Sequence, residues 1–285
     1  MKRVVEAEQY FTSTGVVRQC LDLVRKHYRF DDFGLIVEPC AGAGAFLVEL
    51  PADKRIGLDI LPLHDEIKVQ DFLHWEPASA SGKTLPNKVL TIGNPPFGRR
   101  AKLAVQFIEK AAEFSDVIAF ILPRSFNKYT FQNRVPSNFY LVDSLEAQDF
   151  ETPDGEPLTI KSVFQIWEKR DTPRAKLKVE RTHPDFELRH AHLSRVTPAQ
   201  MTQLHQEYEF AIPQVGKIFT PRDADGITKG SYWFVKPIKP EVRQIFESLD
   251  FTFLDNMNVN LKSISKADIV TAYRAAQPTV KVKNS

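Results

Sequence analysis

The fold is decided by residues 35–46, which read LIVEPCAGAGAF. The first four residues are typical of a short buried strand, and the chain then enters a turn with Gly42 and Gly44 two positions apart. Glycine in such a turn lets the backbone approach a ligand closely, and open α/β sheets bind ligands at the carboxyl ends of their central strands. The stretch therefore favours a ligand site here, although a glycine pair after a strand also occurs in tight turns that bind nothing.

Apolar, β-branched runs recur along the chain, with helical stretches between them. The runs span residues 35–38, 55–60, 67–70, 89–92, 117–122, 139–145 and 162–168. Residues 117–122 read VIAFIL, an unbroken apolar run typical of a strand buried on both faces. Residues 100–114 place apolar side chains on one helical face, as a crossover helix does. We therefore predict an α/β fold with a mostly parallel seven-stranded sheet and helices on both faces.

A second, smaller module is predicted after Arg170, where Pro, His and charged residues become frequent. This α+β module would span residues 171–285, and residues 1–170 would form the larger domain. The strand-like pieces of the second module are residues 176–179, 186–189 and 232–235. Helices are expected after Pro240 and after Ser265, because the first is a first-turn proline and the second opens a capping box.

The composition excludes several classes of protein. Only two of the 285 residues are cysteines, so neither a disulfide framework nor a paired zinc spacing is expected, and the histidines lack partners at metal spacing. No signal core and no run of about 18 uncharged apolar residues is present, which predicts an intracellular protein without membrane contact. The net charge of +2 conceals an asymmetry, since residues 170–285 hold 18 Lys and Arg against 13 Asp and Glu. A mildly basic second module suits contact with phosphates, although many solvated domains carry such a surplus.

Acidic residues follow the next two predicted strands. Asp59 comes 15 residues after Gly44, at a position where an acid can accept hydrogen bonds from a ribose diol. Asp71 ends the third strand and is followed by Phe72, whose ring could lie against a purine. Taken singly, each acid could equally cap a helix or a surface turn; their order and spacing favour the ligand interpretation.

The segment most informative about chemistry is residues 91–98, which read TIGNPPFG. Pro95 and Pro96 cannot continue a strand or a helix, so they stiffen the chain directly after a buried strand. The side-chain oxygen of Asn94 and the carbonyl of Pro95 are then two fixed acceptors, with Phe97 as a flat wall beside them. Such a set suits a planar substrate that carries an NH2 group, although a merely rigid loop would use the same prolines.

These segments together resemble the amino-methyltransferases of the class I S-adenosylmethionine-dependent, Rossmann-like fold. Residues 9–13, QYFTS, are similar to the segment that precedes the glycine turn in adenine-N6 DNA methyltransferases of the γ arrangement, with Ser13 in place of the usual proline. Residues 120–126 and 162–167 are similar to later strands of that family, so the resemblance covers about residues 8 to 170.

The resemblance implies a cofactor, S-adenosyl-L-methionine, no metal, and a set of site residues. Asn94, Pro95, Pro96 and Phe97 would be catalytic. The cofactor would be bound by Tyr10, Phe11, Thr12, Glu38, Pro39, Cys40, Ala41, Gly42, Gly44, Phe46, Asp59, Ile60, Asp71, Phe72 and Asn94. Asp59 would hold the ribose, Asp71 with Phe72 the adenine, and residues 10–12 the methionine part.

A nucleic-acid substrate, with DNA favoured, is the predicted partner. A base within a duplex would have to be flipped into the site, which requires positive contacts. The candidates for nucleic-acid binding are Arg99, Arg100, Lys102, Lys217, Arg222, Lys229 and Trp233. Arg99, Arg100 and Lys102 could equally be a solvated helix start, and Trp233 could equally belong to the core.

Four alternatives stay open at this stage. The Asn-Pro-Pro-Phe motif is shared with enzymes that modify adenine or guanine amines of RNA, and its tyrosine form with enzymes that methylate protein glutamine. The chain could also be an inactive partner that only binds nucleic acid.

Residues 153–157, PDGEP, begin like a nuclease motif but lack its remainder, and they predict a turn instead.

Overall fold

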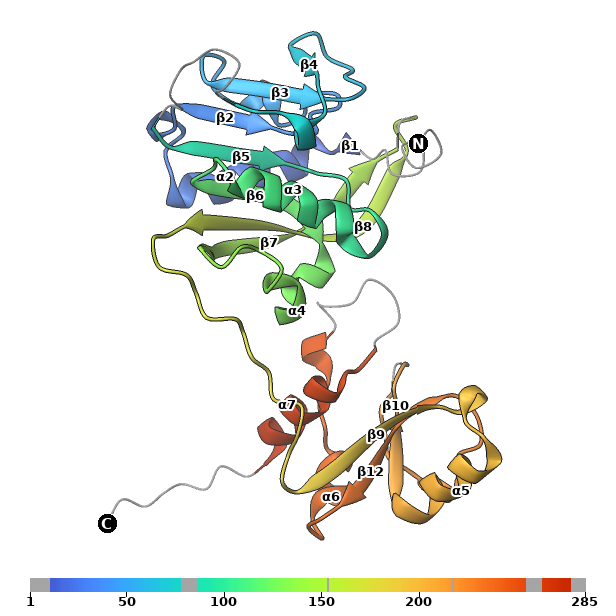
Figure 1. Cartoon of the computed structure of the whole chain (residues 1–285). Helices are drawn as coiled ribbons and strands as arrows, with labels where there is room; N and C mark the ends of the chain where they lie inside the picture. Colours follow the sequence, from blue (N-terminus) through green and yellow to red (C-terminus); the bar gives the residue numbers. More distant parts are fainter. Residues whose placement is uncertain (1–10, 78–86, 153, 217, 255–262, 278–285) are drawn as a thin grey trace, which may run out of the picture. The chain divides into compact units, whose positions relative to one another are not determined.

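The protein consists of two compact units, Met1–Leu177 and Lys178–Ser285. Its structure is a computed structural model that describes residues 11–77, 87–152, 154–216, 218–254 and 263–277 (Figure 1). The composition placed the boundary at residue 170, whereas the contacts place it after Leu177. Arg174 accounts for the difference, because its guanidinium donates to the backbone carbonyls of Gln132, Val135 and Phe139, all within the first unit.

The first unit is built on one large sheet. Its strands are β1 (Phe11–Thr12), β2 (Leu35–Glu38), β3 (Arg55–Asp59), β4 (Ile67–Val69), β5 (Val89–Gly93), β6 (Val117–Pro123), β7 (Phe139–Glu151) and β8 (Pro157–Lys169). The order across the sheet is β1-β7-β8-β6-β5-β2-β3-β4. The five strands from β4 to β6 run parallel, and β8 lies antiparallel between β6 and β7.

The predicted α/β fold is confirmed, with one correction to the sheet. The described residues form eight strands, because Phe11–Thr12 adds a short strand to the edge of β7. Strand β7 also extends six residues further toward the hairpin turn than the predicted run over residues 139–145. Gly155, with φ +82°, lies in that turn, where the sequence predicts one.

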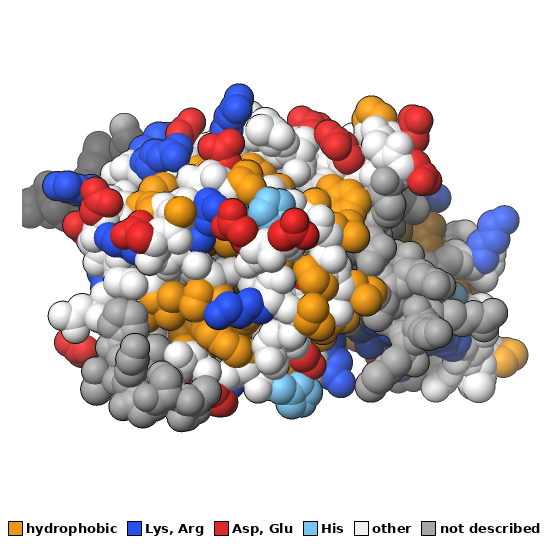
Figure 2. Space-filling view, turned by 90° about the horizontal axis from the view of Figure 1, so that it is seen from above, with side chains coloured by type: hydrophobic (Ala, Val, Ile, Leu, Met, Phe, Trp, Pro, Cys, Tyr) orange, Lys and Arg blue, Asp and Glu red, His pale blue; other side chains and the backbone are white. Residues whose placement is uncertain are grey.

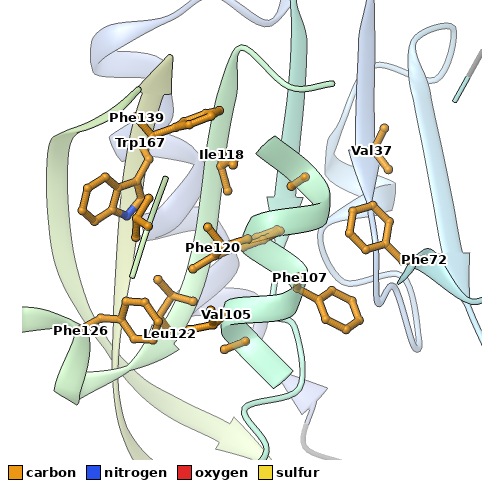
Figure 3. Packing of buried hydrophobic residues seen from close by; sticks show 14 of the residues in the cluster. Val37, Phe72, Val105, Phe107, Ile118, Phe120, Leu122, Phe126, Phe139 and Trp167 are labelled. Atoms are coloured by element: carbon orange, nitrogen blue, oxygen red, sulfur yellow. The ribbon is translucent and has the colours of Figure 1, made fainter. Parts of the chain in front are cut away.

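Helices cover both faces of this sheet, and β6 shows why. Its alternate residues Ile118, Phe120 and Leu122 belong to the core under α3, whereas Val117, Ala119 and Ile121 belong to the core under α2 (Figure 3). A strand with apolar side chains on both faces is stable only between two helical layers. The helices of the unit are α2 (Thr14–His27), α3 (Lys102–Ala112) and α4 (Tyr129–Gln132), with one-turn helices η1 (Phe30–Asp32), η2 (Leu47–Glu49), η3 (Phe72–His74), η4 (Arg99–Ala101) and η5 (Arg124–Asn127).

Strand β4 forms one edge of the described sheet. It has three residues, of which Lys68 and Val69 are exposed. A short edge strand that carries a charge offers little to another chain's backbone. Figure 2 looks at the molecule from the side of β4 and shows apolar side chains in patches between charged ones.

The second unit is a four-stranded antiparallel sheet between helices. Its elements are β9 (Phe186–His192), η6 (Leu193–Arg195), α5 (Pro198–Glu207), β10 (Phe210–Pro213), β11 (Arg222–Asp223), η7 (Ala224–Gly226), β12 (Ser231–Pro237), α6 (Val242–Glu247), η8 (Thr252–Leu254) and α7 (Lys266–Ala276). Leu204 of α5 packs with Phe234 on one face of the sheet, and residues of α6 and α7 pack with Val235 on the other. The predicted capping box at Ser265 is present, but residues 176–179 form no strand.

Candidate active site

The carboxyl ends of the central parallel strands meet at one cavity. Val37 of β2 is in register with Ile56 of β3 and Thr91 of β5, so the three strands end side by side. The cavity at these ends has a volume of about 230 Å³. Its lining consists of Phe11, Thr12, Glu38, Cys40, Ala41, Gly42, Ala43, Ala45, Phe46, Asp59, Ile60, Leu61, Leu63, Asn94, Pro95, Pro96, Phe97, Leu103, Phe150 and Ile160.

The glycine turn is tied to the acid of the neighbouring strand. The N–H of Gly42 donates to Oδ2 of Asp59 at 2.8 Å, and the N–H of Leu61 donates to Oδ1 at 2.8 Å. Gly42 has φ +52°, a left-handed conformation that favours glycine. Each carboxylate oxygen can accept a further hydrogen bond, so Asp59 presents oriented acceptors to a ligand.

Glu38 is a buried acid in the wall of the cavity. Its side chain is 2% exposed, and Oε2 has no hydrogen-bond partner among the described residues. Burial raises the pKa of Glu38 well above its ordinary value, and the charge of Asp59 raises it further. Hydrogen bonds from the backbone N–H groups of Leu47 and Phe46 lower it in part. Gly93 leaves room for this side chain, since a Cβ at Gly93 would lie 3.2 Å from Cγ of Glu38. An unpartnered buried carboxyl oxygen suits a ligand that carries a donor or a positive charge.

Asn94 lines the same cavity and carries a second unpartnered acceptor. Its Nδ2 donates to Oγ1 of Thr12 at 3.3 Å, and its Oδ1 is buried without a partner in the described part of the chain. Phe97 lines the cavity and packs against the core under α2. Asn94, Pro95 and Phe97, which the sequence predicts to act together, therefore all line one cavity.

The chemistry of the lining excludes some ligands. Among the described residues that line the cavity there are two carboxylates, and no Lys, Arg or His. A pyrophosphate would lack positive partners there, and the Gly42 N–H that could bind it is already used by Asp59. Burial and the neighbouring carboxylates raise the pKa of Cys40, which keeps it as a thiol and a poor nucleophile. The cavity suits a cationic ligand with flat or apolar parts.

The structure places two predicted cofactor residues elsewhere. Phe72 is 1% exposed and stacks on Phe107 with ring centroids 5.3 Å apart, so its ring belongs to the core and does not line the cavity. Asp71 caps η3 by accepting from the N–H of Leu73 and pairs with His74. Its charge still reaches the site, because it contributes to the raised pKa of Cys40.

Gly44 and Pro39 also lie outside the lining. Gly44 has φ +83°, donates its N–H to the carbonyl of Ala41, and sits where a Cβ would lie 3.4 Å from the His64 ring. It shapes the turn and leaves ligand contact to its neighbours. Tyr10, predicted to bind the cofactor, lies outside the described residues.

The predicted nucleic-acid residues are mostly on the surface. Arg99, Arg100, Lys102, Arg222 and Lys229 are exposed. Lys217 lies outside the described residues.

Trp233 is half-buried and donates its indole N–H to the carbonyl of Ile264 at 2.9 Å. Its ring lies against His190, with centroids 5.0 Å apart. These contacts hold the ring within the second unit, in agreement with its plainer interpretation as part of the packing.

The sequence analysis missed a part of the apolar lining. Phe150 and Ile160 come from the far end of the β7–β8 hairpin, Leu103 from the first turn of α3, and Leu61 and Leu63 from the loop after β3. Of these residues, only Leu61 and Leu63 carried a local sequence signal, because they follow Asp59 at the end of a predicted strand.

The sheet order and the site together define the class of the fold. The sheet has parallel strands in the order β4-β3-β2-β5-β6, followed by the antiparallel β8 and by β7, and its cavity lies at the glycine turn. This arrangement is the class I methyltransferase fold.

No helix of the described residues is long and apolar enough to cross a membrane.

Comparison with known proteins gives distant similarities. No family model matches the chain. A curated relative, the protein ENHANCED DOWNY MILDEW 2 of Arabidopsis thaliana, is 24% identical over 220 residues, which cover 70% of this chain. The chain spans 16% of the length of that protein.

Solved structures are similar over somewhat more than half of the chain. A candidate RNA methyltransferase from Pyrococcus horikoshii is 18% identical, with a TM-score of 0.44, over 58% of this chain and 88% of that one. Magnesium protoporphyrin IX methyltransferase from Synechocystis, solved with bound SAM, is 11% identical, with a TM-score of 0.40, over 55% and 79%. A candidate class I methyltransferase from Listeria monocytogenes is 15% identical, with a TM-score of 0.37, over 59% and 64%.

Proposed function

We propose that this protein transfers a methyl group from S-adenosyl-L-methionine to the exocyclic N6 amine of adenine in nucleic acid, with DNA as the favoured polymer. The observation that carries the proposal is the buried, unpartnered Oδ1 of Asn94, a residue that lines the cavity together with Phe97. A buried acceptor without a partner is costly unless a ligand completes it. An amine that offers two N–H donors is such a ligand.

The residues of the cavity fit the methyl donor. S-adenosylmethionine carries positive charge on its sulfur and on its ammonium group, and the unpartnered Oε2 of Glu38 suits one of these charges. Its ribose diol suits the free acceptor sites of Asp59, whose carboxylate is held by the N–H groups of Gly42 and Leu61. Its adenine suits the apolar rim that Leu61 and Leu63 form.

The bound cofactor would supply an activated methyl group, and this chain would prepare the amine that attacks it. The Oδ1 of Asn94 and the carbonyl of Pro95 accept the two amine hydrogens, which favours a tetrahedral nitrogen and frees its lone pair from the ring. The freed lone pair would accept the methyl group that the sulfonium of the cofactor supplies, and the cofactor would leave as the neutral thioether. The same two oxygens stabilise the positive charge that develops on nitrogen, whose proton then leaves to solvent. Phe97 holds the base in line.

The proposal is tested by offering the full-length protein four polymers in parallel. Tritiated methyl donor is incubated with duplex DNA, single-stranded DNA, RNA and protein, and the labelled product is identified by nucleoside or amino-acid analysis. Labelled N6-methyladenine from DNA supports the proposal. Label in RNA alone, in guanine, or in glutamine reassigns the substrate, and failure to bind the methyl donor by calorimetry overturns the proposal altogether.

Asp59→Asn is expected to weaken binding of the methyl donor about tenfold, since an amide nitrogen cannot accept and one charge-assisted acceptor is lost. Isothermal titration calorimetry measures this change. Asp65→Asn is the matched control, because Asp65 is exposed in the same loop region and does not line the cavity. Equal affinities of the Asp59→Asn variant and the wild type would remove Asp59 from the cofactor site.

Removing the second unit is expected to weaken binding of a DNA duplex more than tenfold and to leave affinity for the methyl donor within about twofold, because the phosphate-contacting surface would be lost while the cavity is kept. The cut belongs after Leu177, since Arg174 and the N–H of Leu177 bond to the first unit. Fluorescence anisotropy and calorimetry measure the two affinities. Equal losses would mean that residues 178–285 serve the stability of the first unit.

A further inference from the structure

The side-chain amide of Asn94 has two different ends, and only its oxygen can accept a hydrogen bond from an amine. Oδ1 of Asn94 accepts hydrogen bonds, whereas Nδ2 carries two donors. If the amide were rotated by half a turn, its NH2 group would face the NH2 group of the substrate, and no hydrogen bond would form. Activity that depends on Asn94 therefore requires a partner for Nδ2 on the side away from the substrate.

Thr12 is that partner in the structure. Its Oγ1 accepts from Nδ2 of Asn94 at 3.3 Å, and the Thr12 residue is 9% exposed, so water replaces this contact poorly. The opposite end of the same amide, Oδ1, is the end left without a partner among the described residues.

The backbone holds Thr12 at this place from both sides. In strand β1, Thr12 pairs with Phe150 of β7, and Phe150 itself lines the cavity. The next residue, Ser13, donates its N–H to the carbonyl of Asp149 and caps α2 through its side chain. The hydroxyl is thus carried by a short strand anchored to a hairpin on one side and to a helix on the other.

We propose that Thr12 is a positioning residue that keeps the oxygen of the Asn94 amide directed at the substrate amine. The inference rests on the proposed function and adds to it a residue that anchors the Nδ2 end of the amide while Oδ1 receives the substrate amine. Loss of the hydroxyl leaves the Nδ2 end buried without a partner, which disfavours the productive orientation of the amide.

The test compares Thr12→Val, which removes the hydroxyl at nearly constant volume, with Thr12→Ser, which retains it. Thr12→Val is expected to lower kcat about tenfold, with the Kd of the methyl donor within about twofold, and Thr12→Ser to stay within about threefold of wild type. Thr14→Val is the matched control, because Thr14 is exposed two residues along the chain. A Thr12→Val variant that loses cofactor affinity at unchanged kcat would overturn the proposal and make Thr12 a cofactor ligand.

A double-mutant cycle separates positioning from mere packing. In an Asn94→Ala background no amide remains to be held, so Thr12→Val should then change the residual kcat less than about twofold. The same tenfold loss in both backgrounds would overturn the proposal.

A measurement without turnover distinguishes failure of this proposal from failure of the proposed function. The side-chain amide protons of Asn94, assigned in ¹⁵N-labelled protein by their disappearance in Asn94→Asp, should exchange with water slowly in the wild type and in Thr12→Ser. In Thr12→Val they should exchange at least about tenfold faster. Equal exchange in all three proteins would show that Thr12 does not hold the amide, whatever reaction the protein catalyses.

Discussion

Asn94→Ala lowers kcat for methyl transfer on the order of 10² to 10³-fold, the expected result of removing one preorganised group that stabilises developing charge. The Kd of the methyl donor should change less than about twofold, because this interaction is made mainly with the substrate amine in the transition state. Single-turnover rates with tritiated donor and calorimetric titration of the same preparation measure the two quantities.

The matched control for this variant is Asn87→Ala. Asn87 is exposed and does not line the cavity, so its replacement should change neither quantity. A fully active Asn94→Ala protein would exclude Asn94 from the mechanism. A parallel loss of cofactor affinity and of rate would indicate instead that Asn94 serves the cofactor.

The sheet could be predicted from the sequence because its central strands are buried on both faces. In β6 every residue is buried, and such a run has no other stable place in an α/β fold. The edges of the sheet were harder to predict. The outer halves of β7 and β8 mix charged and apolar residues, and the pairing of the two strands contains two register shifts.

The polar part of the site could be predicted for a related reason. Glu38, Asp59 and Asn94 each lie at or directly after the carboxyl end of a buried parallel strand, and such ends meet at one edge of the sheet. The role of Phe72 could not be predicted, because an aromatic residue after an acid fits a purine and a core equally well. Its ring lies in the core, in contact with the rings of Trp75, Phe107 and Phe114.

The second unit was the hardest part to predict. Residues 176–179 alternate apolar and charged side chains as a strand does, yet they connect the two units and have no regular structure. Strand β10 is only four residues long and was missed, because its partners β11 and β12 are distant in sequence. Strand pairing of this kind depends on tertiary contacts more than on local propensity.

Glu38→Gln is expected to weaken binding of the methyl donor on the order of 100-fold, because it removes one partner of a buried charge pair. Binding of a positive group to Glu38 requires the ionised carboxylate, whereas burial favours the neutral form in the empty protein by raising its pKa well above the ordinary value of 4.5. Cofactor binding should therefore release a proton, and affinity should rise with pH toward the raised pKa. Calorimetry in two buffers of different ionisation enthalpy measures the released proton, and Glu38→Gln should abolish it.

The same raised pKa predicts an opposite effect of Glu38→Gln on stability. A carboxyl group whose pKa is higher in the folded than in the unfolded chain stabilises the fold at low pH, and this contribution is lost as pH rises through the folded-state pKa. The neutral amide does not undergo this loss, so the melting temperature of the empty Glu38→Gln protein should exceed that of the wild type by a margin that grows as pH rises above 4.5. Glu49→Gln, at an exposed position in η2, should show neither effect. A melting-temperature difference that stays constant between pH 5 and pH 8 would show that Glu38 is ionised in the empty cavity, and the acid would then already be prepared for a cationic ligand.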